Sequence, residues 1–144
     1  MPMKEAVDWA LTVSYQVSLD NAELGEFATC EGLGIEVVME TREEGGNNDF
    51  AWSLPTRLKY PNVKLTRPLS ADAAKVVRWI SGVVESSERS NGKIVARTSA
   101  GTVVLTWALS DVVPVRWTGP AFNSESSKVA VETLELAHHG FRVS

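Results

Sequence analysis

The alternation of apolar and polar side chains is clearest near the start of the chain. Residues 11–19 read Leu-Thr-Val-Ser-Tyr-Gln-Val-Ser-Leu, and strict alternation over nine positions predicts a half-buried β-strand. Further segments rich in β-forming residues, separated by turn residues, are 35–42, 57–67, 93–98, 102–109, 112–117 and 128–138. The pattern therefore predicts about seven strands, at spacings typical of a β-barrel or sandwich.

One segment, residues 70–87, has the period of a helix. Ser70 is a suitable N-cap, and the segment ends in polar residues. Apolar residues recur on one helical face at Val76, Val77, Ile80, Val83 and Val84. We therefore expect a single amphipathic helix that packs on a sheet.

Three local features modify this picture. Residues 43–49 contain no core residue and include Gly-Gly and Asn-Asn, which predicts an exposed loop or hairpin tip. Proline at position 61 removes a backbone donor, so a bulge, bend or edge is expected at Pro61-Asn62. Glu132 shares strand parity with Leu134 and Leu136, which places a carboxylate either in the core or at an interface.

Composition favours one globular domain over residues 1–144. The chain is 44% apolar and 22% charged, with one cysteine, so an internal disulfide is excluded. The adjacent His138 and His139 point to opposite faces of a strand and cannot chelate one ion together, so we expect both to lie at the surface near a strand end. Motifs for nucleotide binding, zinc proteolysis or an activated serine are absent from the sequence. We therefore expect no enzymatic activity, no cofactor and no metal.

Charge is unevenly distributed along the chain. The formal net charge is −9 for residues 1–50, +6 for residues 51–97 and −1 for residues 98–144. Either solvated faces differ in charge by chance, or faces of opposite sign meet on neighbouring copies, where such complementarity fixes register. The beginning of the chain lacks the basic and apolar pattern of a secretory signal.

Short motifs follow one another in a distinctive order. Residues 17–20 read Val-Ser-Leu-Asp, residues 25–33 Gly-Glu-Phe-Ala-Thr-Cys-Glu-Gly-Leu and residues 42–46 Arg-Glu-Glu-Gly-Gly. Residues 60–67 read Tyr-Pro-Asn-Val-Lys-Leu-Thr-Arg, and residues 131–140 Val-Glu-Thr-Leu-Glu-Leu-Ala-His-His-Gly. In this order the chain resembles the contractile-phage tail tube family, which includes the inner tube proteins of extracellular phage-tail-like contractile injection systems.

The resemblance implies a mainly β fold in which two packed antiparallel sheets form a β-barrel with one flanking helix. It also implies hexameric rings that stack into a hollow tube, which a contracting sheath drives into a target to deliver cargo. The implied partners are further copies of the chain, a sheath protein, baseplate and cap proteins, and a protein or DNA cargo in the lumen. Assembly in the cytoplasm as part of a phage-tail-like particle or virion, with release outside the cell, is expected.

The predicted loop at residues 43–49 is the candidate for contact between rings, because its carboxylates can meet the basic segment, residues 51–97, of another copy. The candidate interface residues are Glu40, Glu43, Glu44, Gly45, Gly46, Asn47, Asn48, Asp49, Arg57, Lys59, Lys64 and Arg67. Two alternatives remain open at this point. One is a monomeric β-barrel that binds a small ligand among the five tryptophans, and the other is the tail tube of a contractile phage that delivers DNA.

Overall fold

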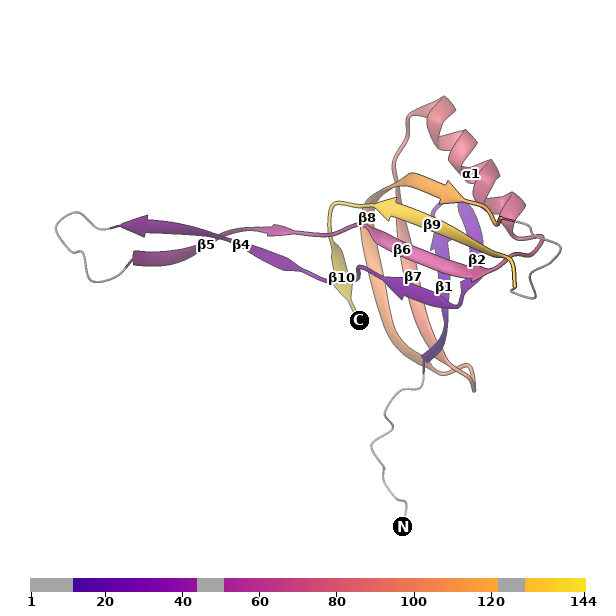
Figure 1. Cartoon of the computed structure of the whole chain (residues 1–144), viewed down its shortest axis with the longest axis horizontal. Coiled ribbons are helices and arrows are strands. Elements are labelled where there is room, and N and C mark those ends of the chain that lie inside the picture. The colour runs from indigo at the N-terminus through magenta and orange to yellow at the C-terminus, as the bar shows by residue number, and fades with distance from the viewer. Residues whose placement is uncertain (1–11, 44–50, 122–128) are drawn as a thin grey trace, which may run out of the picture.

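A computed structural model describes residues 12–43, 51–121 and 129–144 (Figure 1). Within these ranges the chain forms ten strands and one helix. In chain order they are β1 (Thr12–Leu19), β2 (Ala22–Phe27), β3 (Thr29–Glu31), β4 (Glu36–Glu43), β5 (Ala51–Lys59), β6 (Val63–Pro68), α1 (Ala73–Ser86), β7 (Ser90–Thr98), β8 (Val103–Thr118), β9 (Val131–Ala137) and β10 (Phe141–Val143).

Eight strands form one curled antiparallel sheet rather than the two separate packed sheets that we expected. The strand order is β2-β1-β7-β8-β9-β6-β3, and β10 pairs with β8. The long strand β8 joins both halves, since it pairs first with β7 and then with β9. Residues 102–109 and 112–117, predicted as separate strands, belong to this one strand, which adopts a positive φ of 53° at Asp111. The irregularity there redirects the strand without ending it.

The strand pairings form an open path and not the closed barrel of the sequence-based prediction. The two ends of the path, β2 and β3, are consecutive in the chain and are separated by Ala28, whose N–H donates to the Thr66 carbonyl at 2.9 Å. Beside this point the Arg67 side chain donates to the carbonyls of Leu24 and Glu26. A buried side chain, and not a strand ladder, therefore satisfies these backbone groups of β2.

The core lies inside the curled sheet and under α1. Fully buried side chains come from both halves of the sheet and from the helix, and they include Val17, Leu24, Phe27, Val63, Leu65, Val76, Ile94, Val112, Leu134 and Leu136. Strand residues of one parity face this core, as alternation predicts.

The helix was predicted correctly, but the prediction of which side chains it buries was only partly correct. α1 buries Val76 and Trp79, whereas Val77 and Val84 are 43% and 73% exposed. Asp72 is the N-cap residue, and the hydroxyl of Ser70 accepts a hydrogen bond from its N–H. The apolar residues of α1 therefore exceed what the core beneath it covers.

Strands β4 and β5 form a separate two-stranded sheet that projects from the body as an arm (Figure 1). Residues 57–67, predicted as one strand, are divided between the arm and the body, because β5 ends at Lys59 and β6 begins at Val63. The interruption lies at Pro61-Asn62, where a defect was expected. The chain leaves the body after β3 and returns to it at β6, so the arm extends two neighbouring strands of the sheet.

Candidate assembly surfaces

The arm has one apolar face. In its register Val37 pairs with Leu58 and Met39 with Pro55, and directly paired residues lie on the same face of a sheet. Val37, Met39 and Leu58 are 46%, 52% and 53% exposed. We call Val37, Met39, Pro55 and Leu58 the apolar face of the arm. Large apolar side chains that are this exposed and this close together are typical of a protein interface.

A β-bulge places these four residues together. The register shifts between Val38 and Met39, and at this point the Thr56 hydroxyl donates to the Val38 carbonyl at 2.8 Å. The extra residue in β5 changes its parity. Without it, Pro55 and Leu58 would lie on opposite faces of the arm, because they are an odd number of residues apart.

The opposite face of the arm is largely charged. Glu36 pairs with Lys59, Val38 with Arg57, Glu40 with Leu54, and Arg42 with Trp52. The oppositely charged pair Glu36–Lys59 stabilises an exposed face in water, and Leu54 and Trp52 place apolar side chains among the charges. The arm therefore presents two chemically different surfaces.

The predicted interface residues do not form one cluster. Glu40, Arg57 and Lys59 lie on the charged face of the arm, and Glu43 ends β4. Glu44, Gly45, Gly46, Asn47, Asn48 and Asp49 lie outside the described residues. Lys64 lies on the body, in register with Glu31 and Glu135.

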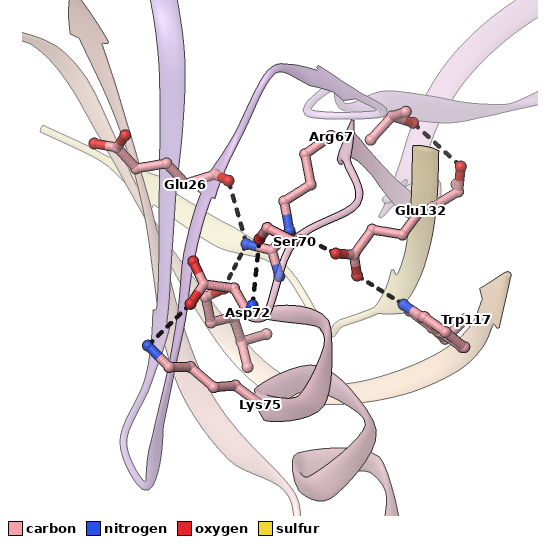
Figure 2. Close-up of polar contacts among 10 residues, drawn as sticks. Glu26, Arg67, Ser70, Asp72, Lys75, Trp117 and Glu132 are labelled. Atoms are coloured by element: carbon pink, nitrogen blue, oxygen red, sulfur yellow. Dashed lines mark hydrogen bonds and ion pairs between the residues drawn. The ribbon is translucent and has the colours of Figure 1, made fainter. Parts of the chain in front are cut away.

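Arg67 is not available to another copy, which corrects its assignment to the interface. It is 4% exposed, and its Nε donates to Oε2 of Glu132 at 2.9 Å. Its Nη1 donates to the carbonyls of Leu24 at 2.7 Å and Glu26 at 3.2 Å (Figure 2). Since Arg67 shares the parity of the core residues of β6, it turns inward, and charge alone gave no indication of this.

Glu132 is the centre of this buried network. It is fully buried, and its second carboxylate oxygen accepts a hydrogen bond from Trp117 Nε1 at 2.8 Å (Figure 2). The guanidinium carbon of Arg67 lies 4.0 Å from the centre of the Phe27 ring. Burial of a carboxylate at this position was one of the two outcomes predicted from its parity. The partner of Glu132 could not be predicted from its strand alone, although Arg67 and Glu132 occupy core-facing, directly paired positions of β6 and β9.

The root of the arm is held by the C-terminal segment. Tyr60 follows β5 directly, and its ring lies 5.6 Å from that of His138 and 5.3 Å from that of Phe141. Gly140 has a φ of +124°, and a Cβ atom there would lie 3.1 Å from the Tyr60 ring. Only glycine therefore satisfies both the backbone conformation and the close contact.

His138 is buried in this cluster, contrary to the surface position that we expected for both histidines. Its Nδ1 accepts a hydrogen bond from the Gly140 N–H at 3.0 Å, and burial lowers the pKa of its imidazole. His139 is exposed and lies 3.2 Å from Asp111 and 3.4 Å from Arg89. The neutral ring of His138 is thus the form that fits the fold.

Acid should weaken this fold through His138. Its ordinary pKa is 6.5 and its folded pKa is lower, so the unfolded chain binds the proton first as pH falls. Stability should be complete above pH 6.5 and decline from there down to the folded pKa. Thermal unfolding across this range should show a smaller decline for His138→Phe than for the parent chain. Equal slopes in the two proteins would contradict the prediction.

Chemical groups that could carry a reaction are sparse in the described chain. Burial raises the pKa of the Cys30 thiol to about 12, so it remains protonated and unreactive near neutral pH. No group of three or more metal-ligating side chains occurs in residues 12–43, 51–121 and 129–144. Over the same ranges, no helix is both long and apolar enough to span a membrane.

Comparison with sequence models of known families identifies the family of this chain. A sequence model described as T4-like virus tail tube protein gp19 matches residues 11–142. The chain belongs to this tail tube family. The match spans the curled sheet, the helix and the arm, so the whole described fold is a tail tube fold. Among curated proteins, none matches this chain.

Several solved structures have the same fold. A chain of the PVC extracellular contractile injection system sheath–tube complex in its extended state superposes with a TM-score of 0.77 and 22% identity, covering 96% of this chain and 93% of that one. A chain of the anti-feeding prophage baseplate gives 0.74 and 21%, covering 100% and 97%. Hcp1 from Flavobacterium johnsoniae gives 0.53 and 10%, covering 91% and 94%. At these identities the likeness concerns the fold.

Proposed function

We propose that this tail tube protein is the inner tube subunit of a contractile injection system. Residues 1–144 act as one tail tube domain, six copies close into a ring, and rings stack into a hollow tube inside a contractile sheath. Baseplate and cap proteins bind its ends. The particle assembles in the cytoplasm, acts outside the cell, and delivers a cargo when the sheath contracts. The subunit itself performs no catalysis.

The apolar face of the arm is the observation that carries this proposal. A two-stranded hairpin alone is marginally stable in water, and both of its edges offer unpaired backbone groups. Burying the apolar face of the arm on another copy adds the hydrophobic stabilisation that the hairpin lacks on its own. A contact between two different surfaces of identical chains forms a ring if it closes and a filament if it does not. A tube requires both kinds of contact, one that closes each ring and one that repeats from ring to ring.

The other candidate functions differ in how well they account for the arm. A monomeric ligand-binding barrel leaves the apolar face of the arm exposed without a role. The tail tube of a contractile phage accounts for it equally well, and the family takes its name from a phage protein. Structures from extracellular injection systems cover nearly the whole chain, which favours the injection system as the first proposal.

Charge on the arm supplies a second contact in this proposal. Glu40, Glu43, Glu44 and Asp49 of one copy approach basic residues of a copy in the next ring, with Arg57, Lys59 and Lys64 as candidates. Salt should weaken such a contact because exposed charges are screened. The double variant Glu43→Lys/Glu44→Lys tests it, and unchanged tube formation at moderate salt would remove this contact from the proposal.

Negative-stain imaging of the purified full-length chain tests the function directly. We expect rings with a central hole, or hollow rods, whose class averages have six-fold symmetry. Size-exclusion chromatography with light scattering should show a species much larger than the 15.7 kDa subunit. A monodisperse monomer across a wide concentration range, without rings or rods, would refute the tube function.

A further inference from the structure

The arm is joined to the body by two short connections that contain no strand pairing. They are residues 32–35, between β3 and β4, and residues 60–62, between β5 and β6 (Figure 1). Within the described residues, neither β4 nor β5 pairs with a strand of the body. The two connections touch each other, since a Cβ atom on Gly32 would overlap the Asn62 carbonyl oxygen. They form a hinge, and the direction of the arm depends on what holds this hinge to the body.

The body side of the hinge is the turn between β9 and β10. The His139 N–H donates to the Ser110 carbonyl, and the Ser110 N–H donates to the Gly140 carbonyl, both at 2.9 Å, so the turn is tied to β8. His138 begins this turn and is 8% exposed, and its Nδ1 accepts from the Gly140 N–H at 3.0 Å. The proton of the neutral ring therefore lies on Nε2, which is buried without a hydrogen-bond partner among the described residues.

The arm side of the hinge is Tyr60, whose ring packs on this turn. Its centre lies 5.6 Å from that of the His138 ring and 5.3 Å from that of Phe141, and the latter two are 6.0 Å apart. Aromatic rings attract one another at these separations. The Tyr60 ring also lies against Gly140, where a Cβ atom would come within 3.1 Å of it. His138 and its neighbours thus tie the arm to the body through side-chain packing.

A second proton on the His138 ring is incompatible with this arrangement. It would be added at Nδ1, where it would point at the Gly140 N–H, so that two donors would face each other. The turn has no room to separate them, because Gly140 has a φ of +124° and lies against the Tyr60 ring. A buried charge without hydrogen-bond acceptors is also unfavourable. The protonated ring must therefore turn toward water, and it then gives up its contact with Tyr60.

We propose that His138 is a proton-sensitive latch at the root of the arm: the neutral ring holds the arm in its projecting direction, and protonation releases it. The consequence for assembly rests on the proposed tube function, in which the arm binds another copy. Strand β4 has eight residues, which span about 26 Å, so a rotation of about 10° at the root moves the tip by about 5 Å. Apolar side chains touch only within about 4 Å. Release of the latch therefore weakens contacts between copies.

The latch should open as the pH falls below 6.5, the ordinary pKa of histidine. In the open state the ring is in water and has this pKa, whereas burial lowers the pKa of the ring in the closed state. Protons therefore favour the open state below pH 6.5, increasingly so down to the pKa of the closed state. Repulsion from a charged His139 lowers the pKa of His138 further, so both rings act in the same direction.

The other groups around the turn offer the charged ring no partner. Asp111 on β8 contacts His139 at 3.2 Å, and Glu135 on β9 accepts from Asn62 at 2.9 Å, so both carboxylates are engaged elsewhere. The remaining titratable or charged side chains on the elements packed here, or beside Asp111, are a phenol and three cations: Tyr60, Lys59, Arg89 and Arg142. The cations oppose a further positive charge at His138.

Hydrogen exchange of the Gly140 amide measures the latch in the dissociated full-length chain. After correction for the chemical exchange rate, its protection at pH 5.5 should be about tenfold lower than at pH 7.5, because pH 5.5 is one unit below the pKa of the open state. The core amide of Leu65 should be far better protected at both pH values, since the latch opens without unfolding the body. Protection of Gly140 that does not change with pH, or that equals that of Leu65, would overturn the inference.

His138→Asn is the matched variant. Its amide oxygen can accept from the Gly140 N–H and does not titrate, so the pH dependence of Gly140 protection should disappear. His138→Phe keeps an aromatic ring against Tyr60, gives up the acceptor, and should lose the pH dependence as well. It serves as the second variant if circular dichroism shows that His138→Asn does not fold. A tenfold pH effect that persists in the folded variant would assign it to another group and overturn the inference.

Assembled material tests the consequence of the latch. Parent rods moved from pH 7.5 to pH 5.5 should release about tenfold more free subunit into the supernatant, and His138→Asn rods should change by less than about twofold. Protonation of the carboxylates on the arm is common to both proteins, so their difference isolates His138. Equal release from both would overturn the role of the latch in assembly and leave the tube function standing. If the parent forms neither rings nor rods, the tube function fails, whereas Gly140 exchange still decides whether the latch exists.

Discussion

Replacing Glu132 with alanine should destabilise the subunit more than any other single change considered. The substitution leaves the Arg67 guanidinium buried without its carboxylate and deprives Trp117 of its acceptor. Breaking a buried ion pair by removing one partner costs about 3–5 kcal/mol. Since small domains have a total stability of about 5–15 kcal/mol, a large fraction of the unfolding free energy should be lost. Chemical denaturation monitored by tryptophan fluorescence measures it.

The double variant Arg67→Met/Glu132→Leu is the control for this prediction. It removes both charges and keeps apolar volume, and such replacements are often neutral or stabilising. Recovery of most of the lost stability would show that the uncompensated charge is the cause. The carbonyls of Leu24 and Glu26 also lose their donor in this variant, so recovery should be incomplete. A loss below about 1 kcal/mol for Glu132→Ala would place the pair in the range of exposed ion pairs and contradict its burial.

Charged substitutions on the apolar face of the arm should abolish assembly without unfolding the subunit. In the double variant Met39→Asp/Leu58→Asp, two exposed side chains gain a charge, which costs little in the free arm. In an interface the same carboxylates lose water without a partner, at a cost of several kcal/mol each. Two such groups should shift assembly by several orders of magnitude in subunit concentration. Sedimentation velocity and negative stain measure this loss, and circular dichroism verifies the fold.

Leu54→Asp compares the other face of the same arm, where Leu54 pairs with Glu40. The contact proposed there is between exposed charges, so its loss of assembly should be much smaller than that of the double variant. Equal loss of assembly in both variants would mean that both faces of the arm are buried in the tube. Unchanged assembly of the double variant would remove the arm from the interface altogether.

The β-rich fold and its inward-facing residues follow from local patterns. The alternation in residues 11–19 predicted β1, and Val17 and Leu19 are buried there. The helical period predicted α1, and the proline at position 61 predicted the interruption between β5 and β6. These predictions succeed because side-chain period and backbone donors are properties of the segment itself. For the same reason the order of motifs sufficed to recognise the tail tube family.

The pairing of charges could not be predicted in this way. Arg67 is basic and lies in the most basic third of the chain, so it was placed at an interface. In the folded chain, β6 lies beside β9, with Arg67 in register with Glu132. Nothing local relates two residues so far apart in the sequence. The same limitation applies to α1, where Val77 and Val84 have the same local pattern as the buried residues and differ only in what lies opposite them.

By itself, the sequence determined a mainly β chain with one helix, the parity of the core strands and membership of the tail tube family, since all three depend on residues close together in the chain. Only the tertiary structure decided that β4 and β5 leave the body as an arm with one apolar face, and that Arg67 is committed to Glu132. Both outcomes depend on which strands become neighbours, and that choice is made by the burial of the whole core and not by any one segment.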